Sequence, residues 1–258
     1  MKARRQGLLA TIVFCMVSTF AHASDELSGK QWTFDVLLDD KRIGFHTFEV
    51  QQEGEGQVLT TEASFDVKFL FVTAFRYRHQ NTEVWREGCL SSIDAATDNN
   101  GKKLVVRGAA GPEGFNLQNG NGSTALPACV QSFAYWNPAV LESARLLNSQ
   151  TGVYETVSVT FESRDQVPVA GRLVDALRYR LSAQAGDITL WYASTDGTWL
   201  GLEAPAKGGR KILYQAVTIP ESGPSRQRLA HVTTLLKTGS SKRRPATSPH
   251  PTRNDRGG

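Results

Sequence analysis

The sequence predicts a mainly β protein: a single, strongly curved antiparallel sheet, a half-barrel or open barrel, with one short helix that covers or plugs it. Three observations predict this architecture. Apolar and polar residues alternate along residues 59–77, turn residues recur between short apolar runs, and one later stretch, 137–147, has apolar residues at helical spacing. A period of two indicates strands with one buried face.

The alternating stretch is too long to be one straight strand. At about 3.3 Å per residue it would span roughly 60 Å, more than the width of a domain of about 200 residues. We therefore expect a sharp bend or a turn near residues 69–73. Its odd-numbered side chains form an aromatic stripe on the concave side of the sheet, either as a core or as the wall of an apolar cavity: Leu59, Thr61, Ala63, Phe65, Val67, Phe69, Phe71, Thr73, Phe75 and Tyr77.

The N-terminus has the pattern of a secretory signal peptide. Basic residues at Lys2, Arg4 and Arg5 precede an apolar run at 8–20, and Ala21-His22-Ala23 follows as a cleavage site. A membrane anchor is the alternative, but the apolar run is shorter than the roughly 20 residues that a span needs. We expect residues 1–23 to be removed and the mature protein to be periplasmic or secreted.

The charge is concentrated at the two ends of the chain. The whole sequence has a net charge of +4, of which residues 1–23 carry +3 and residues 237–258 carry +5, so that residues 24–236 carry about −4. The C-terminal segment is rich in Pro, Ser, Thr and Gly, a composition typical of disorder. We expect residues 24–236 to form one domain and 237–258 a disordered basic tail. Such a tail can contact an anionic membrane weakly, whereas an exported chain rarely meets nucleic acid.

Strands are expected along most of the mature chain, separated by polar or glycine-containing turns. The strongest turn signal is Asp98-Asn99-Asn100-Gly101, because Asn-Gly supplies the left-handed residues of a tight hairpin. Besides the aromatic stripe, the expected strands are 31–38, 43–51, 76–86, 89–95, 104–107, 114–118, 154–161, 172–181, 188–193, 199–203 and 211–219.

One helix is expected at residues 137–147. Asn137 is a good N-cap, Pro138 suits the first helical position, and an apolar stripe follows at Val140, Leu141, Ala144 and Leu147. Aromatic residues just before it would let the helix plug one opening of the sheet. Residues 226–236 are a candidate for a terminal helix.

Two cysteines, Cys89 and Cys129, remain after residues 1–23 are removed. An even pair in an exported protein can close a disulfide, and two free, buried thiols are the alternative.

The sequence contains no pattern that predicts catalysis, a metal or a cofactor. The mature histidines, His46, His79, His231 and His250, are scattered, and neither C-x-x-C, H-E-x-x-H nor G-x-S-x-G occurs. His79 shares the parity of the aromatic stripe and should reach the concave side, as a core or rim histidine rather than a base. We therefore expect a protein that is not an enzyme and has no cofactor.

Several short motifs, in this order, resemble an uncharacterised family of exported bacterial proteins with a domain of unknown function. They cover residues 32–219 and are Tyr77, His79, Glu83-Val84-Trp85, Gly88, 97–102, Tyr135-Trp136-Asn137-Pro138, Leu190-Trp191-Tyr192, Trp199-Leu200-Gly201-Leu202 and Tyr214. That family is similar to curved half-barrels of the lipoprotein-carrier kind, in which a bent sheet wraps a helix or an acyl chain. The resemblance implies a fold and a compartment, and no catalytic residue.

Abundant aromatic residues on a curved sheet favour binding over catalysis. The sequence predicts a soluble envelope protein that binds or shields a lipid or another hydrophobic ligand. The alternative is a structural or interaction protein of the cell envelope with a dry core and no ligand. The expected ligand-lining residues are Phe65, Val67, Phe69, Phe71, Phe75, Tyr77, Trp85 and Trp136.

Overall fold

The computed structural model describes residues 29–69 and 72–221. The predicted signal peptide, the basic tail and the candidate helix at 226–236 lie outside the described residues. Within the described ranges, no helix is both long and apolar enough to cross a membrane.

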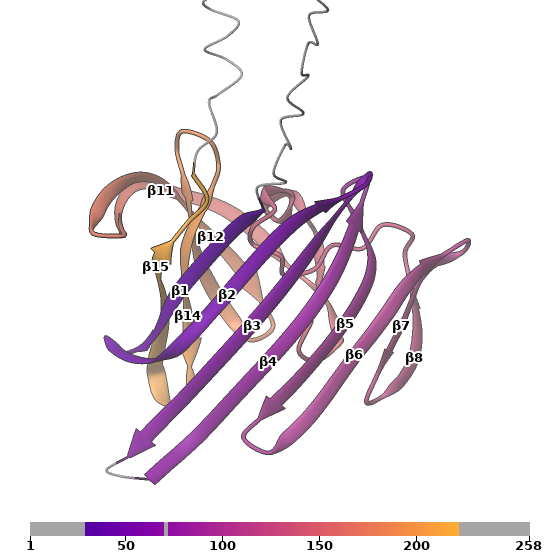
Figure 1. Cartoon of the computed structure of the whole chain (residues 1–258), viewed down its shortest axis with the longest axis horizontal. Helices are drawn as coiled ribbons and strands as arrows, with labels where there is room; N and C mark the ends of the chain where they lie inside the picture. Colours follow the sequence, from indigo (N-terminus) through magenta and orange to yellow (C-terminus); the bar gives the residue numbers. More distant parts are fainter. Residues whose placement is uncertain (1–28, 70–71, 222–258) are drawn as a thin grey trace, which may run out of the picture.

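One 13-stranded antiparallel sheet forms most of the molecule (Figure 1). Its strand order is β11-β12-β13-β14-β15-β1-β2-β3-β4-β5-β6-β7-β8. Strands that pair in this sheet are therefore consecutive along the chain, except for β15 and β1. The strands are β1 Lys30–Leu38, β2 Lys41–Glu53, β3 Gly56–Phe69, β4 Val72–Arg86, β5 Cys89–Asn99, β6 Lys102–Gly111, β7 Gly114–Asn119, β8 Gly122–Leu126, β11 Ser158–Val169, β12 Arg172–Ala183, β13 Gly186–Ala193, β14 Trp199–Ala206 and β15 Arg210–Thr218.

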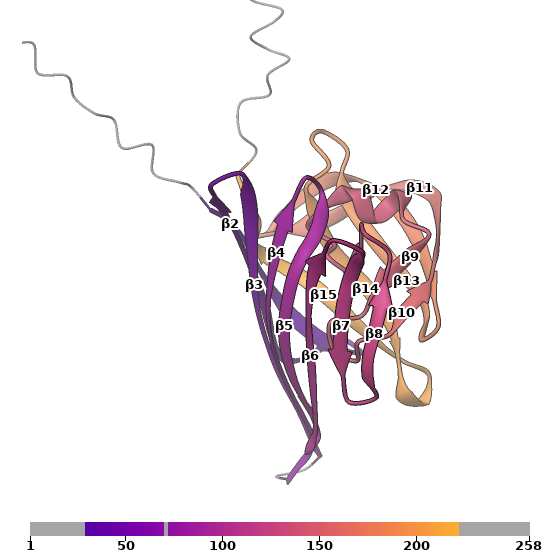
Figure 2. The ribbon, with the colours of Figure 1, turned by 90° about the vertical axis from the view of Figure 1, so that its right-hand side faces the viewer.

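The sheet arches but does not close into a barrel. In the side view, β2 to β6 form one wall and β11 to β13 lie across from it (Figure 2). The edge strands β8 and β11 are not paired with each other, although the backbone N–H of Ala170, just after β11, donates to the carbonyl of Ala216 in β15 at 3.3 Å. The prediction of a mainly β, strongly curved open sheet is confirmed.

The long alternating stretch folds as a hairpin, as its length required. β3 ends at Phe69 and β4 begins at Val72, and Phe65 pairs with Tyr77 across the two strands. Because paired residues share a face, the odd-numbered positions of both strands point to the concave side. Leu59, Ala63, Phe65 and Tyr77 are accordingly buried.

The predicted tight turn also has the expected geometry. Asn100 and Gly101 both adopt positive φ values, 55° and 90°, between β5 and β6. Two successive left-handed residues match the twist of a two-residue hairpin.

The predicted helix at 137–147 is wrong. The Asn137 side chain does accept a hydrogen bond from Ala139 N at 3.1 Å, but only a five-residue 3-10 turn, η1 (Pro138–Glu142), follows. The chain becomes extended at Ser143 and forms β9 (Arg145–Leu147), which pairs with β10 (Tyr154–Thr156). Strand pairing with β10 therefore overrides the local helical spacing.

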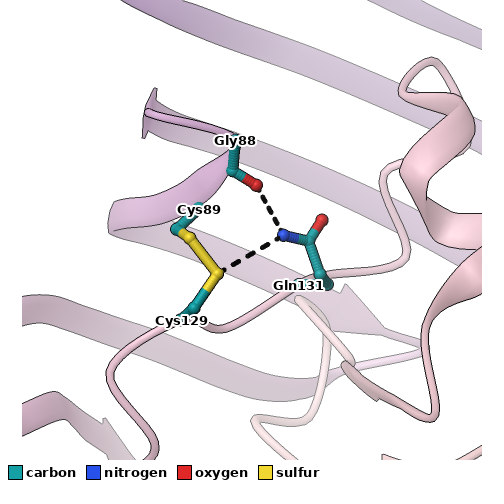
Figure 3. The surroundings of a disulfide bond; sticks show 4 residues. All are labelled: Gly88, Cys89, Cys129 and Gln131. Carbon is teal, nitrogen blue, oxygen red and sulfur yellow. Dashed lines mark hydrogen bonds between the residues drawn. A yellow bond between two sulfur atoms is a disulfide. The ribbon is translucent and has the colours of Figure 1, made fainter.

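The segment of residues 129–157, called here the strap, crosses the concave side of the sheet. A disulfide between Cys89 and Cys129 ties its start to β5, and Gln131 Nε2 donates to the carbonyl of Gly88 at 2.5 Å (Figure 3). Of the two alternatives that the sequence left open, the structure thus shows the disulfide.

The strap supplies much of the core. Val130, Leu146 and Leu147 are fully buried, and the rings of Trp136 and Trp85 meet edge to face at 5.9 Å between centroids. An irregular strap with two short strands, rather than a helix, therefore covers the inside of the arch.

Candidate functional site

A cavity of about 420 Å³ lies between the strap and the concave face of the sheet. Strands β2, β3, β4, β14 and β15 contribute to its wall, and strap residues such as Phe133, Tyr135 and Ser149 face them. The cavity is partly open to solvent. Its volume falls in the range of ligand sites, about 300–1,000 Å³.

Aromatic rings form much of the wall. Phe65 and Tyr77 stack with ring centroids 5.0 Å apart, and Tyr214 meets Phe65 at 6.4 Å. Burial raises the pKa of both Tyr77 and Tyr214, so their hydroxyls stay protonated and can donate or accept hydrogen bonds. The wall thus combines apolar faces with a few polar tips.

The structure brings part of the predicted site together. Phe65, Phe75 and Tyr77 line the cavity. Trp85 and Trp136 pack against each other in the core, and half-buried Val67 is not among the lining residues. The side chains of Phe69 and Phe71 lie outside the described part of the chain.

Polar side chains occupy the middle of the concave face, and we call Thr61, Asn81, His46, His79 and Glu83 the polar patch. Strand register explains their grouping. Thr61 in β3 pairs with Asn81 in β4. Ala63 in β3 pairs with His46 in β2 on one side and with His79 in β4 on the other. Side chains directly opposite have Cβ atoms about 4.5–5.5 Å apart, and diagonal ones about 7–8 Å apart. The patch is therefore continuous across β2, β3 and β4.

The two histidines approach over the small side chain of Ala63. Their ring centroids lie 6.4 Å apart. His46 Nδ1 shares a hydrogen bond of 3.1 Å with the Tyr214 hydroxyl, and His79 Nδ1 shares one of 2.9 Å with Thr97 Oγ1. Burial lowers the pKa of His79 to about 4 and that of His46 well below its ordinary value, so both rings are neutral at neutral pH.

Glu83 is a buried carboxyl group, only 2% exposed, that joins the sheet to the strap. Its Oε1 accepts from Asn81 Nδ2 at 2.9 Å, and its Oε2 accepts from Trp85 Nε1 and from Ser132 Oγ, both at 3.0 Å. Burial raises the pKa of Glu83, and these three donated hydrogen bonds act in the opposite direction. The carboxyl oxygens are thus occupied by protein donors.

Three buried atoms of the polar patch have no hydrogen-bond partner among the described residues. They are His46 Nε2, Thr61 Oγ1 and Asn81 Oδ1, and all three residues line the cavity. Buried polar atoms without partners are rare, because each one costs about 1–3 kcal/mol. Their concentration on one wall marks the patch as a place that a ligand or water can satisfy.

A serine approaches the other nitrogen of His79. Ser149 Oγ lies 3.5 Å from His79 Nε2, which gives a Ser-His-Thr series with Thr97 in the orienting position. Acyl transfer also needs backbone donors for an oxyanion. In the turn that carries Ser149, the N–H groups of residues 150, 151 and 152 donate to the side chain or carbonyl of Asn148.

Within the described ranges, no three His, Cys, Asp or Glu side chains gather closely enough to hold a metal ion. The polar patch contains two histidines and a carboxyl group, but the oxygens of Glu83 are directed to Asn81, Trp85 and Ser132. The arrangement favours hydrogen bonding over metal coordination.

Reasoning from the sequence placed His79 on the concave side, and the structure confirms this: it is 3% exposed and lines the cavity. It missed His46, Asn81 and Glu83, which line the cavity together with His79. The signal was present in part, because Asn81 and Glu83 continue the odd parity of Tyr77 and His79 along β4.

Comparison with solved structures finds the same kind of fold. The crystal structure of a beta-barrel-like protein of domain of unknown function DUF1849 from Brucella abortus aligns with a TM-score of 0.54 at 9% sequence identity, over 76% of this chain and 98% of that one. No curated protein matches the sequence. The model of the family described as domain of unknown function DUF6134 matches residues 34–217, and this chain belongs to that family.

Proposed function

We propose that the protein binds a lipid or another amphipathic small molecule in the concave cavity. One observation carries the proposal: three of the residues that line an aromatic-walled cavity of about 420 Å³ each have a buried polar atom that no described residue satisfies. Ligand sites in proteins combine apolar walls with a few placed polar groups in this way.

Binding is better supported than hydrolysis by the same cavity. The hydroxyl of Ser149 faces His79, but the neighbouring backbone N–H groups already donate hydrogen bonds to Asn148. A tetrahedral oxyanion would therefore find few donors at this turn.

We propose further that the protein works in the cell envelope after export. The N-terminal pattern of residues 1–23 supports this, and so does the Cys89–Cys129 disulfide, because such bonds persist in oxidising compartments. The basic segment at 237–258 would add weak attraction to anionic membranes.

Native mass spectrometry and solvent extraction of the protein purified from a secreting host test the binding. We expect a co-purifying apolar molecule, and quenching of tryptophan emission when alkyl-chain probes bind. Ala204→Trp should abolish both, because Ala204 lines the cavity and a bulky ring there would fill it.

Ala96→Trp is the matched control, since Ala96 lies exposed on the outer face of β5, between the inward-facing Ala95 and Thr97. It should bind like the wild type. Absence of any co-purifying molecule, together with no quenching by any probe, would overturn the proposal and favour an envelope protein whose cavity holds only water.

A further inference from the structure

The unsatisfied atoms of the polar patch define what a ligand must offer. Asn81 lines the cavity, is 5% exposed and donates its amide N–H to Glu83, so its Oδ1 is left as an acceptor without a partner among the described residues. Thr61 is 4% exposed, and its hydroxyl can donate or accept. His46 Nε2 is a donor or an acceptor according to the tautomer that Tyr214 imposes. Asn81 Oδ1 therefore needs a hydrogen-bond donor from the ligand, and Thr61 Oγ1 and His46 Nε2 can each take one further partner, a donor or an acceptor.

The cavity disfavours charge of either sign. No lysine or arginine is among its lining residues, whereas two carboxyl groups, Glu83 and Glu155, are. An anionic head would therefore meet no cation. A cationic head would suffer the desolvation that keeps His46 and His79 neutral. Glu83 already uses its oxygens on three protein donors, and Glu155 Oε2 accepts from the backbone N–H of Gln184 at 2.8 Å.

We infer that the polar patch selects ligands whose head is an uncharged hydrogen-bonding group with a donor, such as an alcohol or a primary amide on an apolar chain, over carboxylates and amines. The inference rests on the proposed function and names the ligand class of the same cavity. The head hydroxyl or amide donates to Asn81 Oδ1 and is bound by Thr61 Oγ1 and His46 Nε2. The chain lies along the aromatic wall of Phe65 and Tyr77.

The polarity of Asn81 is set by Glu83, which gives the inference a sharp test. Trp85 and Ser132 both donate to Oε2 of Glu83, so in a Glu83→Gln variant the amide oxygen must take that position. The new amide nitrogen then faces Asn81. Asn81 must turn its oxygen toward it and present its own N–H to the cavity. The acceptor on the wall becomes a donor.

A series of ten-carbon probes distinguishes the heads: 1-decanol, decanamide, sodium decanoate, decylamine, decyl methyl ether and 1-chlorodecane. Their affinities for the purified full-length protein are measured at neutral pH from tryptophan quenching. We expect decanol and decanamide to bind at least about tenfold more tightly than decanoate, decylamine and chlorodecane, the effect of one or two net hydrogen bonds.

Three variants connect this preference to the patch. Thr61→Val and Asn81→Leu should each weaken decanol binding about five- to tenfold and leave chlorodecane unchanged, since one neutral hydrogen bond is lost. Glu83→Gln should raise the affinity of the acceptor-only ether relative to decanol. Thr60→Val, exposed on the opposite face of β3, is the control and should change nothing.

The outcomes separate the two proposals. Binding of decanoate or decylamine as tight as that of decanol would overturn the inference alone, and so would variants of Thr61 and Asn81 that bind decanol normally. Failure of the whole series, chlorodecane included, to bind the wild type would overturn the proposed function and the inference with it.

Discussion

Replacing His79 with asparagine should remove a large part of the acid sensitivity of the fold. The imidazole of His79 is 3% exposed on the concave face, and its Nδ1 is hydrogen-bonded to Thr97 Oγ1 at 2.9 Å. His46 lies 6.4 Å away between ring centroids, and its pKa is lowered as well. An asparagine keeps a polar atom near the position of Nδ1 but does not titrate.

The size of the effect follows from the pKa of His79, which burial lowers from an ordinary 6.5 to about 4. Above pH 6.5 the ring is neutral in both the folded and the unfolded chain, so that it makes no pH-dependent contribution. As the pH falls below that value, the unfolded chain takes up a proton that the folded chain refuses, and stability declines until the pH reaches about 4. At about 1.36 kcal/mol per pKa unit, the free energy of unfolding should drop by roughly 2 kcal/mol between neutral pH and about pH 4.5.

Urea unfolding followed by tryptophan emission at a series of pH values measures this. The His79→Asn variant should lose about 2 kcal/mol less than the wild type over that interval, whatever its stability at neutral pH. Thr97→Val is the control, because it removes the hydrogen bond and retains the titrating ring, and its pH slope should equal that of the wild type. Equal slopes for wild type and His79→Asn would refute the assignment of His79 as a buried, neutral histidine.

Two further predictions concern the frame around the cavity. Gly44→Ala should lower the free energy of unfolding by about 2–3 kcal/mol in denaturant titration, because a Cβ there would overlap the carbonyl of Ser64 in the neighbouring strand; Gly120→Ala, with open space around it, should be nearly neutral. Reduction of the disulfide, whose cysteines are 40 residues apart, should cost up to about 4 kcal/mol in the chain-entropy model and should raise hydrogen exchange in the strap before the sheet; uniform exchange throughout would contradict this.

The fold could be predicted where the pattern within a single strand or turn determines the local structure. In β3 and β4 the alternation alone assigns the inward face, and the chain length forces a turn between them. Asn100 and Gly101 likewise specify their turn locally, because both adopt the left-handed conformation that Asn-Gly favours. Such features need no knowledge of distant partners.

The strap was not predictable in the same way. Residues 137–147 have a helix start signal and helical spacing, but Leu146 and Leu147 are both fully buried in an extended segment. Successive residues of a strand point to opposite faces, so both faces of β9 are covered here. A fully enclosed segment has no exposed face, so that periodicity cannot report its conformation.

The site depends on register between strands, which a single sequence does not reveal. His46 lies at an even position of β2 and His79 at an odd position of β4, and only their common pairing with Ala63 brings them together. His46 and Tyr214 are separated by 168 residues and still share a hydrogen bond. The alternation along one strand identifies which of its residues point inward, whereas the register between strands determines which of these residues are in contact.

The position of the strap explains why a cavity persists beside such a large core. The start of the strap is fixed to β4 and β5, where Trp136 packs on Trp85, Ser132 donates to Glu83 and the disulfide holds Cys129. Further along β3 and β4 the sheet presents the short side chains of Thr61 and Ala63.

Valine in place of Thr61 would have a similar shape and leave no polar side-chain atom at that position of the wall. Each unpaired buried polar atom costs about 1–3 kcal/mol, which an apolar residue of similar shape would avoid. Polar atoms held unsatisfied on a cavity wall therefore reduce the stability of the empty protein. Natural proteins commonly retain such costs at functional sites, where stability and activity conflict. The stability of the sheet therefore does not explain the polar patch, whereas the proposed ligand site would.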